Sequence, residues 1–323
     1  MNKLGRSHEM ILAVSIPQPT TIFGSSYRGR FAPSPTGPLH LGSLATALGS
    51  WLDARAHQGK WLLRIEDVDI PRTLPGATAT ILHQLSTCGL QWDEGICYQS
   101  QRTPYYESAL LQLFQAGLVY PCTCSRQAIV STLAAQGIRP GRHEERIYPR
   151  ICRPIPIPHA LANSEIFNLA SPVAWRIALQ AEELNQSVGD FVLRRADGLF
   201  TYQMAVVVDD AAQNITHIVR GADLASNTAR QIYLQNVLGY PTPHYLHLPL
   251  VLDQQGEKLS KQTMATAIAP DNPQLTLQAL QIAASHLGLI ALPDGLYLTI
   301  AEWLLAATQA WREQKIAGSK LVN

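Results

Sequence analysis

The amino-acid sequence predicts an α/β fold built on a parallel sheet, because strand and helix patterns alternate through the first part of the chain. A short apolar strand precedes Arg30, and the segment 41–56 carries leucines and alanines at helical spacing. The next patterns are a strand at 61–65 and helices at 77–88 and 103–116. Strands that alternate with helices in this order are typical of parallel sheets.

Further elements are expected in the second half of the chain. In order, the patterns are strands at 171–180 and 189–195, a hairpin turn at 196–198, a strand at 215–221, a helix at 226–238, a strand at 248–252 and helices at 272–287 and 298–311. Residues 1–26 show no comparable pattern, and we expect them to form a flexible extension without chemistry of its own.

The composition indicates a globular protein of a reducing compartment. The 323 residues are 46% hydrophobic and 15% charged, so the chain can bury a sizeable core. Lys and Arg number 25 against 24 Asp and Glu, so any nucleic-acid surface must be a local patch. Five cysteines argue against a disulfide scaffold, and the early apolar run 10–16 is too short for a membrane span. We expect a cytoplasmic protein without a membrane partner.

The stretch RFAPSPTGPLHLGS, residues 30–43, is predicted to bind a nucleotide. Its prolines fix the backbone, while Gly37 and Gly42 permit turns and the close approach of a ligand. His40 and Gly42 fall at the start of the helix 41–56, where free N–H groups and the helix dipole favour phosphate. A proline-rich loop that only caps a helix is the alternative.

Glu66 is the candidate group for an ammonium ion. It follows the strand 61–65, and ligands of open α/β sheets bind at the carboxyl ends of strands. Asp69 and Arg72 form a turn-stabilising pair in this interpretation. The alternative is a solvated acidic turn, which we disfavour because the nucleotide-type loop lies only one helix earlier.

A second candidate site is a metal centre within an insertion that begins at residue 120. Cys122 and Cys124 lie two positions apart, and Cys152 follows after a polar arm, so three thiolates can meet around zinc. The chemistry alone leaves the fourth ligand open among His143, Tyr148 and His159, and histidine is the commoner zinc ligand. Free thiols are the alternative.

The loop DQQGEKLSKQ, residues 253–262, carries two lysines that can serve catalysis. Lys258 and Lys261 bracket Leu259 and Ser260 after the last predicted strand. A lysine pair near a triphosphate can offset the charge that develops as pyrophosphate leaves. A solvated basic loop is the alternative, since KLSK alone is a weak motif.

Taken in order, these segments resemble the catalytic half of glutamyl-tRNA synthetases, which are class I aminoacyl-tRNA synthetases. The resemblance rests on RFAPSPTG with HLGS, RIEDVD, TYQMAVVVDD, VRGADL and KLSK, and it extends from Arg30 to Leu287. It implies a Rossmann-like class I catalytic domain with a small zinc-type insertion, a short helical C-terminal region and no anticodon-binding domain. The expected parts are an extension at 1–26, a first catalytic half at 27–119, the insertion at 120–188, a second catalytic half at 189–253 and a C-terminal part at 254–323.

The short chain and the Cys-x-Cys arm more closely resemble the glutamyl-queuosine tRNA(Asp) synthetases. This resemblance implies tRNA-independent activation of L-glutamate with ATP, followed by transfer to queuosine at the wobble position of tRNA(Asp). It selects Tyr148 as the fourth zinc ligand beside Cys122, Cys124 and Cys152. It further implies ATP as substrate and Zn²⁺ in the insertion. Mg²⁺ on the phosphates is expected from their charge, and we expect a monomeric protein.

The resemblance also implies a role for each residue at the active site. The glutamate site would comprise Arg30, Phe31, Ala32, Pro33, Ser34, Glu66, Tyr202 and Arg220. ATP would contact His40, Gly42, Ser43 and Lys261, with His40, Lys258 and Lys261 as the catalytic groups. Ser43 stands where the class I signature has a second histidine, so a hydroxyl replaces one ATP contact or the contact is lost.

Two further interpretations remain open. Five arginines of the arm can form a patch for RNA or can be ordinary surface charge; they are Arg139, Arg142, Arg146, Arg150 and Arg153. The protein can also be a short glutamyl-tRNA synthetase that charges tRNA(Glu), or a catalytically silent relative that binds tRNA.

Overall fold

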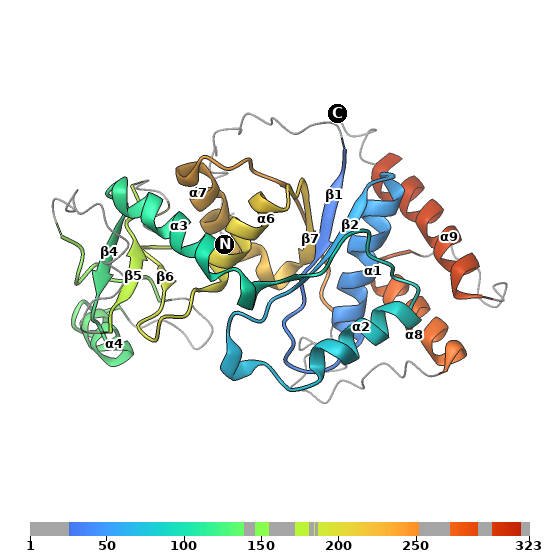
Figure 1. Cartoon of the computed structure of the whole chain (residues 1–323), viewed down its shortest axis with the longest axis horizontal. Coiled ribbons are helices and arrows are strands. Elements are labelled where there is room, and N and C mark those ends of the chain that lie inside the picture. The colour runs from blue at the N-terminus through green and yellow to red at the C-terminus, as the bar shows by residue number, and fades with distance from the viewer. Residues whose placement is uncertain are drawn as a thin grey trace, which may run out of the picture.

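The protein has a parallel α/β core and, at one end, a smaller antiparallel sheet (Figure 1). This computed structural model describes residues 26–138, 146–154, 172–180, 184, 187–251, 272–289 and 299–317. Lys258 and Lys261, the histidines at 143 and 159, and the arm arginines at 139 and 142 lie outside these described residues.

The core contains two groups of parallel strands, ordered β1-β2-β3 and β7-β8. Their bounds are β1 Arg28–Phe31, β2 Lys60–Ile65, β3 Cys97–Tyr98, β7 His217–Gly221 and β8 His244–Leu248. The N–H of Thr216 donates to the carbonyl of Arg28 at 2.9 Å, so β7 lies beside β1 and the two groups meet there. The predicted parallel sheet is therefore confirmed.

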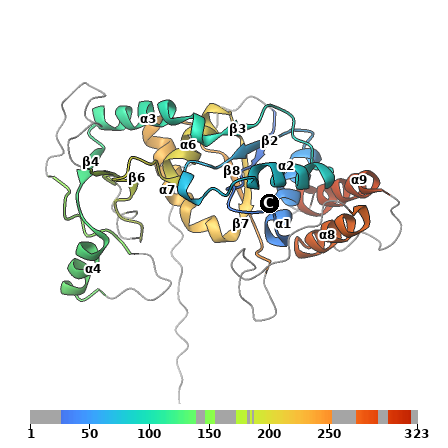
Figure 2. The same ribbon diagram turned by 60° about the horizontal axis from the view of Figure 1, so that its bottom comes forward.

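Helices cover this core as the hydrophobic spacing predicts. α1 Leu41–Ala56 buries Leu44, Leu48 and Leu52 completely. The C-terminal helices α8 Pro273–His286 and α9 Ile300–Trp311 lie side by side against α1 in both views (Figures 1 and 2). The remaining helix on this side is α2 Ala77–Thr87.

The last strand differs from its prediction. The sequence favours a strand at 248–252, whereas β8 covers His244–Leu248 and pairs in parallel with β7. Pro249 has no N–H to continue the ladder, so the strand ends before it. The displacement matters for function because residues 249–251 are then free of the sheet and line the cavity described below.

The antiparallel sheet is formed by β4 Val119–Cys122, β5 Ala174–Ile177 and β6 Val192–Arg194, with the adjoining helix α4 Arg126–Ala135. β6 follows residue 188, the predicted end of the insertion. It nevertheless pairs antiparallel with β5 and so belongs to the same sheet. The region between the two sheets in Figure 1 holds α3 Thr103–Gln115, α6 Tyr202–Ala212 and α7 Thr228–Leu238. None of the helices in the described ranges combines the length and the apolar character needed to cross a membrane.

Candidate active site and cysteine centre

A cavity of about 480 Å³ opens at the carboxyl ends of β1, β2, β7 and β8. This is the position at which open α/β sheets bind ligands. Every described residue that the sequence assigns to glutamate or ATP lines it: Arg30, Phe31, Ala32, Pro33, Ser34, His40, Gly42, Ser43, Glu66, Tyr202 and Arg220. Segments separated by up to 190 positions in the chain thus meet at one site.

The amino end of α1 forms one wall of the cavity. His40 is the N-cap, and its Nδ1 accepts the N–H of Gly42 at 3.2 Å. The Ser43 hydroxyl accepts the N–H of His40 at 2.8 Å and donates to the His40 carbonyl at 2.8 Å. Ser43 therefore holds the backbone of His40 in place, and its contact with ATP stays a prediction.

A buried charge cluster anchors Arg30, which lines the cavity. Arg30 Nε donates to Asp210 Oδ1 at 3.0 Å, and Arg64 Nη1 lies 2.9 Å from the same oxygen. Burial opposes the charge on Asp210, but the two guanidinium groups hold the pKa of this carboxyl below its usual range. Asp210 thereby fixes two arginines, one from β1 and one from β2.

Glu66 lies at the edge of this cluster. Its side chain is 9% exposed, and Oε1 is 3.6 Å from Arg64 Nη2. Burial raises the pKa of Glu66 to about 7, although the charges of Arg64 and Arg30 oppose the rise. Oε1 accepts no hydrogen bond from any residue that the structure describes, so it retains its capacity for a ligand cation.

Arg220 faces the cavity from the end of β7 with its guanidinium held by neighbours. Its Nη1 donates to Gln231 Oε1 at 2.6 Å, and its Nη2 donates to Thr228 Oγ1 at 2.8 Å. Nη1 also lies 3.4 Å from the hydroxyl of Tyr202, whose pKa is raised by burial. A preorganised arginine of this kind suits a carboxylate ligand.

Sequence reasoning missed the residues that hold these side chains. They are Arg64, Asp210, Thr228 and Gln231. The one available signal is the Asp209-Asp210 pair at the end of a fully apolar run in α6, since charged groups rarely lie in such a run without buried partners.

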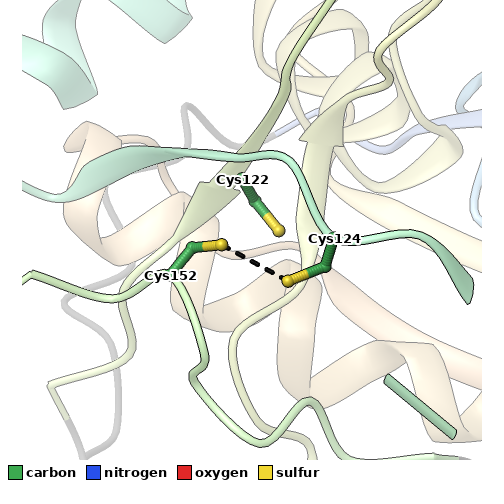
Figure 3. Close-up of side chains that lie close together, drawn as sticks. All are labelled: Cys122, Cys124 and Cys152. Carbon is green, nitrogen blue, oxygen red and sulfur yellow. Dashed lines mark hydrogen bonds between the residues drawn. The ribbon is translucent and has the colours of Figure 1, made fainter. Parts of the chain in front are cut away.

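The second candidate site lies in the insertion, where three cysteines converge (Figure 3). The sulfur atoms of Cys122, Cys124 and Cys152 are all within 4.8 Å of one another. The hydroxyl of Tyr148 is 3.3 Å from Cys122 Sγ and 3.4 Å from Cys124 Sγ. The structure thus brings together all four residues that the resemblance selects.

The donor set fits zinc. Tetrahedral zinc with Zn–S distances of about 2.3 Å separates its ligands by about 3.8 Å, close to the spacing of these atoms. Burial raises the pKa of the Cys152 thiol, but hydrogen bonds from the Thr123 backbone and from Cys124 outweigh this effect and lower it to about 7. A thiol of this kind readily yields the thiolate that a metal binds.

Comparisons with known proteins agree with this geometry. A family model described as tRNA synthetases class I (E and Q), catalytic domain, matches residues 26–150 and 159–274. A relative from Burkholderia cenocepacia named Glutamyl-Q tRNA(Asp) synthetase is 53% identical over 296 residues, covering 88% of this chain and 96% of the relative. A relative of the same name from Albidiferax ferrireducens is 49% identical over 312 residues, covering 89% and 99%.

The fold is similar to the crystal structure of a glutamate tRNA ligase from Elizabethkingia meningosepticum in complex with its amino acid. The TM-score is 0.68 at 25% identity, over 86% of this chain and 64% of that one. The present chain therefore spans less than two thirds of that protein. The family match over most of the chain, supported by these relatives, shows that the chain belongs to the glutamate and glutamine (E and Q) branch of the class I tRNA synthetases.

Proposed function

We propose that the protein activates L-glutamate with ATP and transfers the glutamyl group to queuosine in tRNA(Asp). The observation that carries this proposal is the single cavity in which Glu66, Arg30 and Arg220 meet the nucleotide-type end of α1. The choice of queuosine in tRNA(Asp) as the acceptor rests on the names of relatives that are 53% and 49% identical to this chain. A cytoplasmic monomer is the form we propose.

Glutamate is held by charge at its polar ends. The Glu66 carboxylate accepts the ammonium group, and the Arg220 guanidinium, fixed by Thr228 and Gln231, receives a carboxylate. Arg30 remains anchored on Asp210 and contributes positive charge beside them. Positioning of this kind supplies much of the catalysis when no covalent enzyme intermediate is needed.

Activation then proceeds as a displacement at phosphorus. An oxygen of the glutamate α-carboxylate attacks the α-phosphorus of ATP, the bond to the bridging oxygen breaks, and pyrophosphate leaves with that electron pair. His40 at the start of α1 contacts the phosphates, and Lys258 and Lys261 offset the charge of the leaving group. Mg²⁺ supplies further neutralisation of the phosphates when it is bound.

Transfer follows at the carbonyl carbon of the adenylate. A hydroxyl oxygen of queuosine attacks this carbon, the bond to AMP breaks, and the hydroxyl proton is released to solvent. Zinc on Cys122, Cys124, Tyr148 and Cys152 would fix the fold of the insertion beside the site. Unstacked bases of a loop are the part of RNA that proteins read most readily, which suits a wobble nucleoside as acceptor.

The test is transfer of labelled glutamate to tRNA(Asp) and tRNA(Glu), each prepared with and without queuosine. We expect label on tRNA(Asp) only when queuosine is present. Label on tRNA(Glu) regardless of queuosine would replace the proposal with a short tRNA(Glu)-charging enzyme. Label on neither, with no glutamate-dependent pyrophosphate exchange, would indicate a silent relative.

A further inference from the structure

A separate cavity of about 300 Å³ lies in the insertion, close to the cysteine centre, and arginines dominate its charge. The four arginines that line it come from distant parts of the chain, namely Arg126 of α4, Arg146 of the arm, Arg176 of β5 and Arg230 of α7. We call this group the arginine pocket. Only Arg146 belongs to the arm that the sequence singled out.

The acidic residue of this cavity does not neutralise these charges. Asp190 lines the cavity but is buried, and its carboxylate is already occupied. It accepts hydrogen bonds from Tyr120 at 2.7 Å, from the Leu179 N–H at 2.9 Å and from Arg153 at 3.1 Å. Arg153 is thus a structural partner of Asp190, whereas Arg126 and Arg146 form no ion pair with any described carboxylate.

Arg176 is held rigidly at the wall of the pocket. Its guanidinium carbon lies 3.8 Å from the centroid of the Tyr148 ring, and its Nη1 donates to the backbone carbonyl of Asp190 at 3.1 Å. Its Nε is buried and has no hydrogen-bond partner among the described residues. The guanidinium thus keeps its positive charge at the wall of the pocket, where its one hydrogen bond to a described residue goes to a neutral carbonyl, and such a group suits an anionic ligand.

We propose that the arginine pocket binds a backbone phosphate of the RNA substrate. This inference rests on the proposed function, because that function makes the substrate an RNA. Arginine presents a planar set of donors that matches phosphate oxygens, and several arginines around a small cavity suit a phosphodiester. The pocket therefore positions the RNA without reading its bases.

α7 connects this pocket to the glutamate site. Arg230 lines the arginine pocket, while Thr228 and Gln231 of the same helix hold Arg220. The same helix therefore contacts both the proposed phosphate site and the arginine proposed to bind glutamate. A phosphate contact at the pocket would therefore help to position the queuosine-bearing loop relative to the adenylate.

The test compares two double variants of the full-length protein. Arg126→Gln with Arg146→Gln removes two exposed charges of the pocket that form no hydrogen bonds or ion pairs with described residues. The control, Arg55→Gln with Lys60→Gln, removes two charges near the amino end of β2, away from the insertion. The dissociation constant for queuosine-containing tRNA(Asp) is measured over a range of salt concentrations, together with glutamate-dependent pyrophosphate exchange without tRNA.

We expect the pocket variant to bind tRNA(Asp) at least tenfold more weakly at about 0.1 M salt, with a salt slope reduced by about one to two. The control should change affinity less than about threefold, and both variants should keep pyrophosphate exchange. Equal affinities of the pocket variant and the wild type, or equal losses in both variants, would overturn the inference. A wild type that exchanges pyrophosphate but binds no tRNA(Asp) would overturn the proposed function as well.

Arg176→Lys provides a second measurement at the rigid wall. Lysine keeps the charge but loses the stacked, planar donor group, so tRNA affinity should fall while zinc content stays at that of the wild type. Unchanged affinity would contradict a role for the Arg176 guanidinium in phosphate binding.

Discussion

The guanidinium of Arg64 lies 3.6 Å from the carboxylate of Glu66, and the facing atoms of this pair form no hydrogen bond with any described residue. Both side chains are buried, and Glu66 lines the cavity at the carboxyl ends of the parallel strands. Because burial raises the pKa of Glu66 to about 7, this carboxyl changes its charge near neutral pH in the ligand-free protein.

The first prediction concerns the pH dependence of glutamate binding. Only the ionised form of Glu66 attracts an ammonium group, so KM for glutamate should fall about tenfold for each pH unit up to about 7 and then level off. Pyrophosphate exchange between pH 5.5 and 8.5 measures this directly. In Glu66→Gln, KM should be much higher and nearly independent of pH; a flat wild-type profile would exclude Glu66 as the ammonium ligand.

Stability should show the opposite trend with pH. Since the folded-state pKa of Glu66 lies above the value of about 4.5 expected in the unfolded chain, the folded state binds more protons between these two values. The contribution of Glu66 to stability is therefore complete below pH 4.5 and is lost as pH rises through about 7. Urea unfolding between pH 4.5 and about 7 should show that the free energy of unfolding falls less with rising pH in Glu66→Gln than in the wild type.

Among the buried charges of the site, Asp210 should cause the largest loss of stability when it is replaced. Asp210→Asn leaves Arg30 and Arg64 without their shared carboxylate, and breaking a buried pair costs about 3–5 kcal/mol. Urea unfolding should register this loss, and KM for glutamate should rise because Arg30 loses its anchor. Asp197→Asn is the matched control, because Asp197 is exposed and its pair with Arg195 should contribute less than about 1 kcal/mol.

Local patterns in the sequence predicted the fold and most of the residues that line the cavity, because each motif lies within one short segment of the chain. The loop 30–43 and its helix form one continuous unit, and the structure places both as expected. The cysteine centre was also predicted, although spacing alone left its fourth ligand open.

Contacts between distant segments could not be predicted in the same way. Arg64 and Asp210 pair across 146 positions, and nothing in either local pattern names the other. The neighbours Asp209 and Asp210 illustrate the difficulty: Asp209 accepts hydrogen bonds from Gln99 and Tyr106, whereas Asp210 holds the arginines of the cavity. Their division of roles follows from the orientation of α6, which is set by tertiary packing.

The cysteine centre should control transfer more than activation. Removing the proposed zinc by chelation, or by Cys152→Ser, should loosen the insertion and abolish transfer to tRNA, because Tyr148 belongs both to the cysteine centre and to the arginine pocket. Pyrophosphate exchange should persist, since the cavity proposed to bind glutamate lies at the parallel sheet. Cys97→Ser, at a cysteine of β3 outside the cluster, should keep its zinc by elemental analysis.

Tyr148→Phe tests the hydroxyl of Tyr148 separately from its aromatic ring. The ring still stacks under Arg176, while the oxygen next to Cys122 and Cys124 is lost. We expect zinc affinity to fall at least about tenfold, with the fold retained. Unchanged affinity in competition with a chelator would show that Tyr148 is not a metal ligand.

His40 and Ser43 should have separable effects on ATP use. Ser43→Ala removes the hydroxyl that fixes the His40 backbone and should cost about 1 kcal/mol of stability, while KM for ATP changes little because that hydroxyl is already engaged. His40→Asn keeps an N-cap but removes the imidazole, so stability should hold while kcat for pyrophosphate exchange falls about a hundredfold. If Ser43→Ala instead raises KM for ATP tenfold with stability intact, the hydroxyl contacts the nucleotide directly, and the helix cap is its secondary role.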